Sequence, residues 1–403
     1  MQSILHQLDD QAVWEEFLAH RLVKGRFTWS LFSEADDYVA NERYRPVAQA
    51  FIRGEGPGIP ERKRINKMGT AKKRTIYCFS PDETRVLKLL AYLLYRYDDR
   101  FSPNCYAFRR GIKASDAIFR LRKALQGRKT WAYKLDIHDY FNSISIPILL
   151  PVLRGLLSDD PPLYAFFERM LTDGRARVNG EIVRESRGVM AGTPTSPFLA
   201  DVYLMEVDRH FADAGVVYAR YSDDVILFAE NREELELNKA TLLGFLKKYG
   251  LEVNPDKERI YAPDEPFEFL GFRCQGDAID VSRAVRDKMK GKIRRAARAL
   301  LRWRMAKGLD AEQAMKGMIR KFNAKFFEDG DPDALSWSRW FFPVINRTEG
   351  LKEIDAYLQK YLRYLSTGRH AKANYRVRYA DLKALGYRSL VHEYYRYRSS
   401  TPR

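Results

Sequence analysis

The sequence predicts an α+β fold, with strands and helices mixed in the middle of the chain and helices in the last third. Short stretches rich in Val, Ile and Tyr are interspersed with longer stretches whose apolar residues recur at helical spacing. Hairpin signals occur at Asn179-Gly180 and at the aspartate pair 223–224. From about residue 280 helical spacing dominates. The expected segments are a helical extension at 1–55, a mixed region at 56–275 and a basic helical region at 276–403.

The elements of the first third follow from breaks and spacing. A loop with three glycines and two prolines, at 53–62, ends the first helical segment. After it we expect two strands within 62–79, joined by a basic turn, and then two helices at 82–101 and 113–125. Ser115 is the expected N-cap of the second of these helices.

Further strand signals predict the rest of the mixed region. A short strand at 130–137 is followed by helical spacing to about residue 172, and then by the Asn179-Gly180 hairpin. A Gly/Pro loop near residue 192 leads into one amphipathic helix. The remaining elements are a hairpin over 217–229, a helix at 232–249 and strands at 251–261 and 267–274.

The charge of the chain predicts a polyanionic partner. Of its 403 residues, 70 are Lys or Arg and 53 are Asp or Glu, so the net charge is +17, which is typical of proteins that bind nucleic acid. No apolar run approaches the length of a membrane-spanning helix. The N-terminal stretch turns acidic too early for a secretory signal. Cys78, Cys105 and Cys274 lack the spacing of a zinc site or a disulfide framework, so we expect reduced thiols in a cytoplasmic protein.

Much positive charge falls on one expected helix, at 283–307. Its apolar residues follow i, i+3/i+4 steps and form one stripe: Val285, Met289, Ile293, Ala296, Leu300 and Trp303. Lys and Arg side chains surround the stripe, and Asp287 is the only acidic residue among them. An ordinary solvated face usually mixes its signs, so this density indicates contact with phosphates. The candidate contacts are Arg294, Arg295 and Arg298.

Three aspartates are candidates for a metal site. Asp136 ends a predicted strand, and Asp223 and Asp224 interrupt an apolar hairpin. A simple explanation is that Asp favours the turn. If the two strands are neighbours in one sheet, however, three carboxylates converge, and such a cluster is unfavourable without cations. Two Mg²⁺ ions held by carboxylates can activate an attacking hydroxyl and stabilise a leaving pyrophosphate, so the cluster predicts nucleotidyl transfer.

Several motifs occur in order between about residues 60 and 275. They are INKMGTAKKRTIYCFSP, NCYAFRRGIKASDAI, KLDIHDYFNSI, MAGTPTSPFLADVYL, YSDD, GLEVNPDKERI and FEFLGF. In this order they resemble the sequence blocks of bacterial reverse transcriptases, the broad family that includes group II intron, retron and defence-associated enzymes. The resemblance implies a right-hand polymerase fold, with fingers and a palm of antiparallel sheet plus helices at 56–275 and a helical thumb and C-terminal extension beyond. It also implies an RNA-directed DNA polymerase that uses deoxynucleoside triphosphates, an RNA template and two Mg²⁺ ions, for which Mn²⁺ can substitute, and that makes DNA.

The resemblance assigns catalytic roles to individual residues. Asp136 and Asp223 correspond to the main metal ligands, together with the backbone carbonyl of Ile137, and Asp224 completes the acidic cluster. Lys257 matches a lysine proposed to protonate the leaving pyrophosphate. The alternative for Lys257 is an exposed lysine at a strand end.

Other residues match the nucleotide site of the family. Lys67 and Arg74 lie where fingertip residues grip the triphosphate, and the backbone near His138 and Asp139 would cradle the same phosphates. Phe141 falls at the steric-gate position beneath the sugar. The alternatives are a solvated basic turn for the first pair and a core aromatic for Phe141.

One residue departs from the pattern of the family. Most relatives have glutamine before the glycine of the nucleotide-supporting loop, whereas this chain has Ala191 before Gly192. That glutamine helps to position the incoming nucleotide and the template base, so its loss puts ordinary fidelity and templating in question without touching the metal site. Tyr221 is expected beside the primer terminus.

The last 50 residues suggest the biological setting. Tyrosines recur there among basic residues, which suits stacking on RNA bases, although tyrosines at the margin of a helical core would give the same pattern. The stretch at 337–363 also resembles C-terminal extensions of defence-associated relatives. We therefore expect an enzyme paired with a dedicated noncoding RNA in antiphage defence. The alternatives are a retron-type enzyme that makes RNA-linked DNA, an untemplated or self-primed DNA polymerase, and a catalytically silent RNA-binding module, against which the intact aspartates argue.

Overall fold

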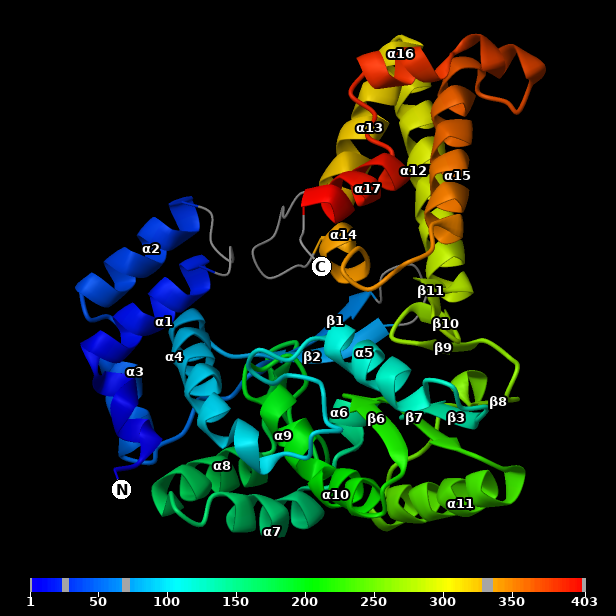
Figure 1. Cartoon of the computed structure of the whole chain (residues 1–403). Coiled ribbons are helices and arrows are strands. Elements are labelled where there is room, and N and C mark those ends of the chain that lie inside the picture. The colour runs from blue at the N-terminus through cyan, green and yellow to red at the C-terminus, as the bar shows by residue number, and fades with distance from the viewer. Residues whose placement is uncertain (1, 24–28, 67–72, 328–335, 401–403) are drawn as a thin grey trace. The chain divides into compact units, whose positions relative to one another are not determined.

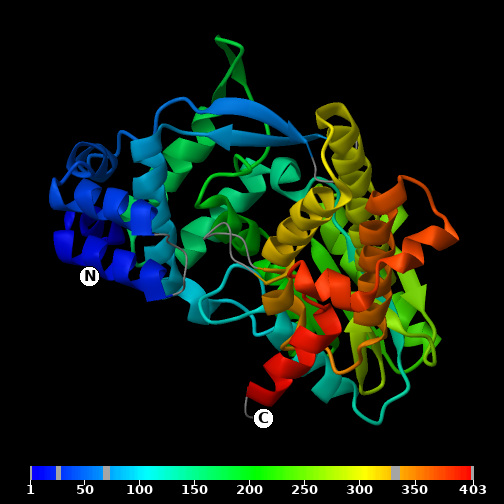
Figure 2. The same cartoon turned by 90° about the horizontal axis from the view of Figure 1, so that it is seen from above.

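The computed structural model describes residues 2–23, 29–66, 73–327 and 336–400 (Figures 1 and 2). The chain divides into a first unit, Met1–Asp264, and a second unit, Glu265–Arg403. The three functional segments expected from the sequence, with breaks near residues 55 and 275, remain a proposal.

Helices of the N-terminal segment pack against the helix that follows the first hairpin (Figure 1). They are η1 (Ile4–Asp9), α1 (Gln11–Val23), α2 (Trp29–Ala40) and α3 (Arg45–Ile52), and the helix they cover is α4 (Pro81–Leu93). Trp14 is buried here, with its ring 4.8 Å from that of Tyr44. The buried carboxylate of Asp160 accepts a hydrogen bond from the Ile4 N–H at 2.9 Å and so joins this segment to the rest of the unit.

A sheet with the strand order β2-β1-β4-β5 is built from two hairpins. The strands are β1 (Glu61–Asn66), β2 (Lys73–Cys78), β4 (Arg175–Val178) and β5 (Glu181–Arg184). The hairpin expected at Asn179-Gly180 is present, with φ values of 52° and 91°. Positive φ at both central residues is what a tight two-residue turn requires, and Asn and Gly tolerate it. The basic turn between β1 and β2 lies outside the described residues.

The central sheet is antiparallel and has the strand order β6-β7-β3-β8. Its strands are β3 (Trp131–Asp136), β6 (Val217–Tyr221), β7 (Asp224–Ala229) and β8 (Arg259–Tyr261). Residues Val225 to Ala229 of β7 are all apolar and all buried. Helices pack against this sheet, and a covered strand is typically a continuous apolar run.

The other helices of the first unit are η2 (Leu94–Arg100), α5 (Ala114–Leu125), α6 (Tyr140–Ser143), α7 (Ile146–Leu156), α8 (Pro161–Asp173), α9 (Ser196–Tyr203), α10 (Met205–Asp213), α11 (Arg232–Lys248) and η3 (Pro255–Lys257). Two expectations about helices were wrong. Ser115 is not an N-cap, because α5 begins at Ala114 and the Asp116 carboxylate accepts from the Lys113 N–H at 2.6 Å. The single amphipathic helix expected after the Gly/Pro loop is divided at Leu204 into α9 and α10.

The second unit begins with a small antiparallel sheet and continues as helices (Figure 1). The strands are β9 (Phe267–Phe269), β10 (Phe272–Gln275) and β11 (Ala278–Val281). The helices are α12 (Arg283–Lys307), α13 (Ala311–Phe327), α14 (Trp337–Phe341), α15 (Glu349–Thr367), η4 (Lys372–Arg376), α16 (Tyr379–Ala384) and α17 (Leu390–Ser400). Strand β11 was not expected.

The buried face of α12 differs in part from the expected apolar stripe. Met289, Ile293 and Ala296 are buried as predicted, but Trp303 is 46% exposed and Leu301 is buried instead. Both α13 and α15 pack against α12, so its buried face is wider and lies further round the helix than a single stripe. In the described part of the chain no helix is long and apolar enough to cross a membrane.

Candidate active site

The pairing of β3 with β7 brings two of the predicted aspartates together. Asp136, the last residue of β3, lies directly opposite Asp224, the first residue of β7. Tyr221 of β6 also pairs with Asp224, so Ser222 and Asp223 form the two-residue turn of the β6–β7 hairpin. Ser222 takes the left-handed conformation that such a turn requires, with a φ of 60°. The turn therefore lies one residue earlier than the expected aspartate pair, with Asp223 in the turn and Asp224 at the start of the strand beside Asp136.

Hydrogen bonds hold this edge of the sheet. The Ile137 N–H donates to the Asp223 carbonyl at 2.9 Å. On the other side of the strand, the Asn254 N–H donates to the Asp136 carbonyl at 2.8 Å, and the Asn254 side-chain amide to the Asp136 carboxylate at 3.3 Å. The Lys257 ammonium donates to the other oxygen of the same carboxylate. Asn254 is a contact that sequence reasoning missed, although it lies in a motif that was recognised.

Each negative charge in the aspartate cluster makes ionisation of the other carboxyl groups less favourable. Burial raises the pKa of Asp223 to about 6, and the charges of Asp136 and Asp224 add to the rise. Burial also raises the pKa of Asp224, whereas the Lys134 ammonium, 3.6 Å from the Asp224 carboxylate oxygen, acts to lower it. Like charges in a partly buried cluster are relieved by a cation. The Lys257 ammonium supplies one positive charge to this cluster.

The donors at this edge fit Mg²⁺ in kind. Asp136 and Asp223 provide carboxylate oxygens, and Mg²⁺ is usually held by one or two carboxylates plus substrate phosphates. Ile137 lies opposite Val253 in an antiparallel bridge, and the residues on either side of this pair make the hydrogen bonds of the bridge. The backbone polar groups of Ile137 therefore point away from Val253 and toward the Asp223 turn. Among the described residues no group of three or more His, Cys, Asp or Glu side chains is arranged as a complete metal site. The metal site therefore stays a prediction.

Phe141 lies at the start of α6 and is half-buried. Its ring packs edge-to-face against Phe108, with centroids 6.2 Å apart, and against Tyr140 at 5.8 Å. The Phe141 carbonyl accepts from the Val189 N–H at 2.9 Å, which fixes its backbone to the loop before α9. Phe108 was not singled out from the sequence. A ring that is held at its edge and partly exposed is compatible with both the steric-gate role and the core alternative.

The backbone after β3 turns sharply into α6. The His138 N–H donates to the Glu252 carbonyl at 2.8 Å, so it is engaged within the protein. Asp139 adopts a φ of 44°, and its carbonyl accepts from the N–H groups of Asn142 and Ser143. The predicted phosphate cradle therefore depends on the backbone from Asp139 onward.

The loop with the alanine departure is attached to strand β2. The Ala191 carbonyl accepts from the Tyr77 N–H at 2.8 Å, and the Ala191 side chain is buried. Gly192 has a φ of +97°, and a Cβ there would lie 3.1 Å from the Cβ of Ile76. Only glycine fits this close approach without strain. The loop thus keeps its backbone place although the usual glutamine side chain is missing.

The remaining predicted residues of the first unit are Arg74, Lys67 and Tyr221. Arg74 is exposed on β2 and pairs in register with Ile65, whereas Lys67 lies outside the described residues. Tyr221 is half-buried at the end of β6, and burial raises its pKa.

The basic residues of α12 separate into two groups. The predicted phosphate contacts are all exposed: Arg294, Arg295 and Arg298. By contrast, Arg286 and Lys290 both pair with Glu353 of α15. Arg304 donates to the Leu365 carbonyl at 2.6 Å. These last side chains hold the helices of the unit together, so only part of the basic set is available to a polyanion.

The C-terminal tyrosines also separate into two groups. The hydroxyl of Tyr387, which is buried, donates to Asp355 at 2.8 Å, and that of Tyr394 donates to the Ile345 carbonyl at the same distance. Three others are exposed: Tyr375 at 76%, Tyr379 at 41% and Tyr395 at 58%. The core alternative holds for the first group, and base stacking remains a prediction for the second.

Comparison with known proteins identifies a family. The model described as reverse transcriptase (RNA-dependent DNA polymerase) matches residues 65–274, which are 210 of the 403 residues. The retron Mx65 reverse transcriptase of Myxococcus xanthus is 26% identical over 175 residues, 41% of each chain. The retron Ec86 reverse transcriptase of Escherichia coli is 22% identical over 235 residues, 57% of this chain and 67% of that one.

Among solved structures, the telomerase of Candida albicans in complex with a fragment of telomeric RNA is 13% identical, with a TM-score of 0.45, and the match covers 86% of this chain and 68% of that one. The chain spans about two fifths of the length of the Mx65 protein. The family match confirms the expected resemblance and the α+β fold of the right-hand polymerase type. The chain belongs to the reverse transcriptase (RNA-dependent DNA polymerase) family.

Proposed function

We propose that the protein is an RNA-directed DNA polymerase that extends a primer along an RNA template with deoxynucleoside triphosphates. The observation that supports this most directly is the register of the central sheet, in which Asp136 lies opposite Asp224 and next to the Asp223 turn. Fold analogy alone would not support an activity, but carboxylates in this arrangement have a specific chemistry.

In the proposed reaction, the primer 3′-hydroxyl attacks the α-phosphorus of the nucleotide. The hydroxyl releases its proton to water, the new O–P bond forms as the bond from the α-phosphorus to the bridging oxygen of the β-phosphate breaks, and pyrophosphate leaves. Two Mg²⁺ ions, when bound, would supply activation of the hydroxyl and neutralisation of the leaving group. Asp136 and Asp223, with the Ile137 carbonyl, would hold them. The Lys257 ammonium, which donates to Asp136, would give a proton to the pyrophosphate, and Phe141 would exclude a 2′-hydroxyl.

The partner we propose is a dedicated structured noncoding RNA, in a cytoplasmic antiphage system. The surplus positive charge and the exposed arginines of α12 support an RNA partner. A retron-type enzyme that makes RNA-linked DNA is the second candidate, because two of the relatives are named retron reverse transcriptases. Sequencing the nucleic acid that copurifies with the protein, before and after ribonuclease treatment, distinguishes the two, since only a retron-type product is DNA covalently joined to RNA.

The test of the catalytic assignment is Asp223→Asn. The amide keeps the shape of the side chain but removes the charge that would bind Mg²⁺, so we expect primer extension to be lost while folding and RNA affinity stay unchanged. Asp213→Asn is the matched control, because this exposed aspartate at the end of α10 undergoes the same chemical change. Extension by the Asp223 variant within tenfold of the wild-type rate would contradict the two-metal proposal.

A further inference from the structure

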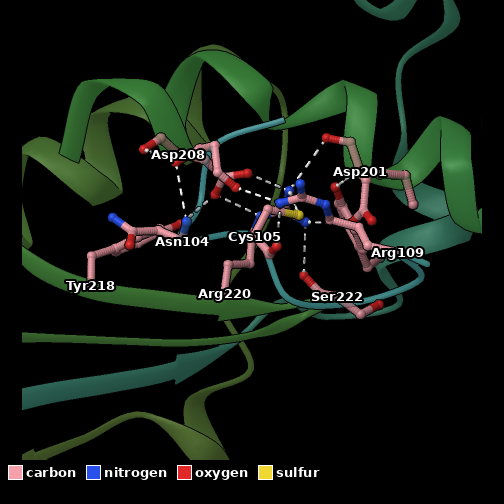
Figure 3. Close-up of polar contacts among 11 residues, drawn as sticks. Asn104, Cys105, Arg109, Asp201, Asp208, Tyr218, Arg220 and Ser222 are labelled. Atoms are coloured by element: carbon pink, nitrogen blue, oxygen red, sulfur yellow. Dashed lines mark hydrogen bonds and ion pairs between the residues drawn. The ribbon is translucent and has the colours of Figure 1, made fainter. Parts of the chain in front are cut away.

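Arg220 of β6 is a charged side chain with no exposed surface (Figure 3). It lies three residues before Asp223, on the strand that leads into the turn. Its neighbours Asp201 and Asp208, on α9 and α10, are also buried. Burying charges is costly even when they are paired, so a fully buried Arg–Asp–Asp group needs a reason.

All three nitrogens of the Arg220 guanidinium make polar contacts within the protein (Figure 3). Its Nε donates to Asp208 at 2.8 Å, and Nη2 donates to the other oxygen of the same carboxylate. Nη1 donates to the Asp201 carboxylate at 3.1 Å, and Nη2 contacts the Cys105 thiol sulfur at 3.2 Å. Bidentate pairing with one carboxylate fixes the plane of the guanidinium as well as its position. The Tyr218 hydroxyl, at 3.0 Å, adds a further donor to Asp208.

One more bond links this group to the turn. Nη1 also donates to the carbonyl of Ser222 at 3.4 Å. Ser222 holds a left-handed φ of 60°, which is unfavourable for a residue with a side chain, so the turn needs support from its surroundings. The next carbonyl along the chain, that of Asp223, is held by the Ile137 N–H. Together these two bonds fix the peptide groups on both sides of the Asp223 Cα.

The backbone of Arg220 is held as firmly as its side chain. Its N–H donates to the Asn104 carbonyl, and its carbonyl accepts from the Tyr106 N–H, each at 2.9 Å. These bonds prevent Arg220 from moving along its strand. The guanidinium is thus a rigid point between the helices α9 and α10 and the turn.

We propose that Arg220, oriented by Asp208 and Asp201, is a positioning residue that fixes the Ser222 carbonyl and thereby places the Asp223 carboxylate beside Asp136. This inference rests on the proposed metal-binding role of Asp223. It assigns to the buried charges a local function that a hydrophobic packing group could not perform, because an apolar side chain cannot hold a carbonyl in place.

Arg220→Lys is the first test, because it keeps the charge but loses the planar fork. Asp208→Asn is the second, because it keeps the shape and removes the charge that orients the guanidinium. The matched control is Asp160→Asn, which alters another buried carboxylate of the same unit, bonded to the N–H groups of Ile4 and Leu163 and not to the turn. Thermal unfolding measures the general loss of stability in all three variants.

Two readouts separate local positioning from general stability. Hydrogen exchange followed by mass spectrometry should show at least tenfold faster exchange in peptides that cover residues 221–224, with residues 131–135 unchanged. In primer extension, kcat should fall at least tenfold, while KM for the nucleotide and the affinity for RNA change less than threefold. The Asp160 variant should leave both readouts at the wild-type level even where its melting temperature falls as far.

Several results would overturn the inference. Wild-type exchange at 221–224 with kcat within threefold in the folded Arg220 and Asp208 variants would remove the positioning role. An equal loss of kcat in Asp160→Asn would assign the effect to stability, and failure of both test variants to fold would show that the group serves the fold rather than the turn. Asp223→Asn, measured alongside, tests the proposed function separately: if it stays active, the metal role fails whatever the exchange data show.

Discussion

Replacing Arg294, Arg295 and Arg298 together with Gln should weaken the salt dependence of RNA binding. All three side chains are exposed on α12. Each phosphate that a cation neutralises releases counterions, so the logarithm of affinity falls with the logarithm of salt concentration by about 0.7 to 0.9 per neutralised phosphate. Removing these three cations should therefore make the slope less steep by about 2 to 3 units. Between 50 and 200 mM salt, that difference in slope corresponds to a factor of roughly 15 to 60 in affinity.

The same helix provides the matched control. Arg286 and Lys290 are already paired with Glu353, so replacing both with Gln removes two cations that share one carboxylate within the unit. This variant should keep the wild-type slope even if it is less stable. The assay is RNA affinity for the wild type and both variants over a salt series, after each is shown to be folded. A wild-type slope in the triple variant would refute phosphate contact at these arginines, and equal flattening in both variants would indicate an unspecific effect of net charge.

Three further predictions follow from the same structure. Phe141→Ala or Phe141→Val should raise ribonucleotide use relative to deoxynucleotide use by on the order of 1 to 3 kcal/mol of discrimination, measured as the ratio of kcat/KM values; an unchanged ratio in an active variant would make Phe141 a core residue. Serine at Tyr375, Tyr379 and Tyr395 should lower RNA affinity at every salt concentration without altering the slope, whereas phenylalanine, which keeps the ring, should not. Burial raises the pKa of Asp201 to about 7. Between about pH 4 and pH 7 the folded protein therefore keeps a proton that the unfolded chain has released, and this contribution to stability declines as pH rises toward 7. Asp201→Asn cannot ionise, so the difference in stability between this variant and wild type should shift in favour of the variant by on the order of 3 kcal/mol as pH rises from 5 to 8. A difference in urea midpoint that stays constant over this range would show that Asp201 titrates normally.

Tyrosine point substitutions are preferable to a C-terminal truncation for a physical reason. Helix α15 packs against α12 and α13, and the Asp355 carboxylate near its middle accepts from the Tyr387 hydroxyl and from the Leu390 N–H. Cutting the chain near residue 355 would expose the apolar sides of two other helices and would test folding rather than RNA binding.

Features that depend on neighbouring residues were predicted well from the sequence. The turn at Asn179-Gly180 depends on the tolerance of Asn and Gly for positive φ, which the residue types reveal directly. The second turn falls at Ser222-Asp223, one residue before the expected aspartate pair. The helix expected from residue 82 begins at Pro81, where Ser80 and Glu83 form a capping box that was not singled out from the sequence. The proximity of Asp136 and Asp224 was expected only on the condition that their strands are neighbours, and the pairing of β3 with β7 meets that condition.

Features that depend on distant partners were not visible. Strand β11 has only four residues, and although buried Ile279 and Val281 alternate with half-buried neighbours, so short a stretch gives no clear strand signal in the sequence. In the sequence Arg220 cannot be distinguished from an exposed residue of a strand, because its partners Asp201 and Asp208 lie on two helices. Only the three-dimensional pairing of these charges distinguishes a buried Arg from an exposed one.

The replacement of the usual glutamine by Ala191 should affect only one part of the proposed nucleotide site. The contact that attaches this loop to β2 is made by the backbone, through the Ala191 carbonyl and the Tyr77 N–H, and does not depend on the side chain. Gly192 keeps its left-handed φ and its close approach to Ile76, so the loop retains its path. What the alanine removes is the reach of a longer polar side chain, and the carboxylates of the proposed metal site lie on other elements. An effect of Ala191 should therefore appear in the selection of nucleotides against the template, and the rate of the chemical step with a correct nucleotide should depend on Asp136 and Asp223 instead.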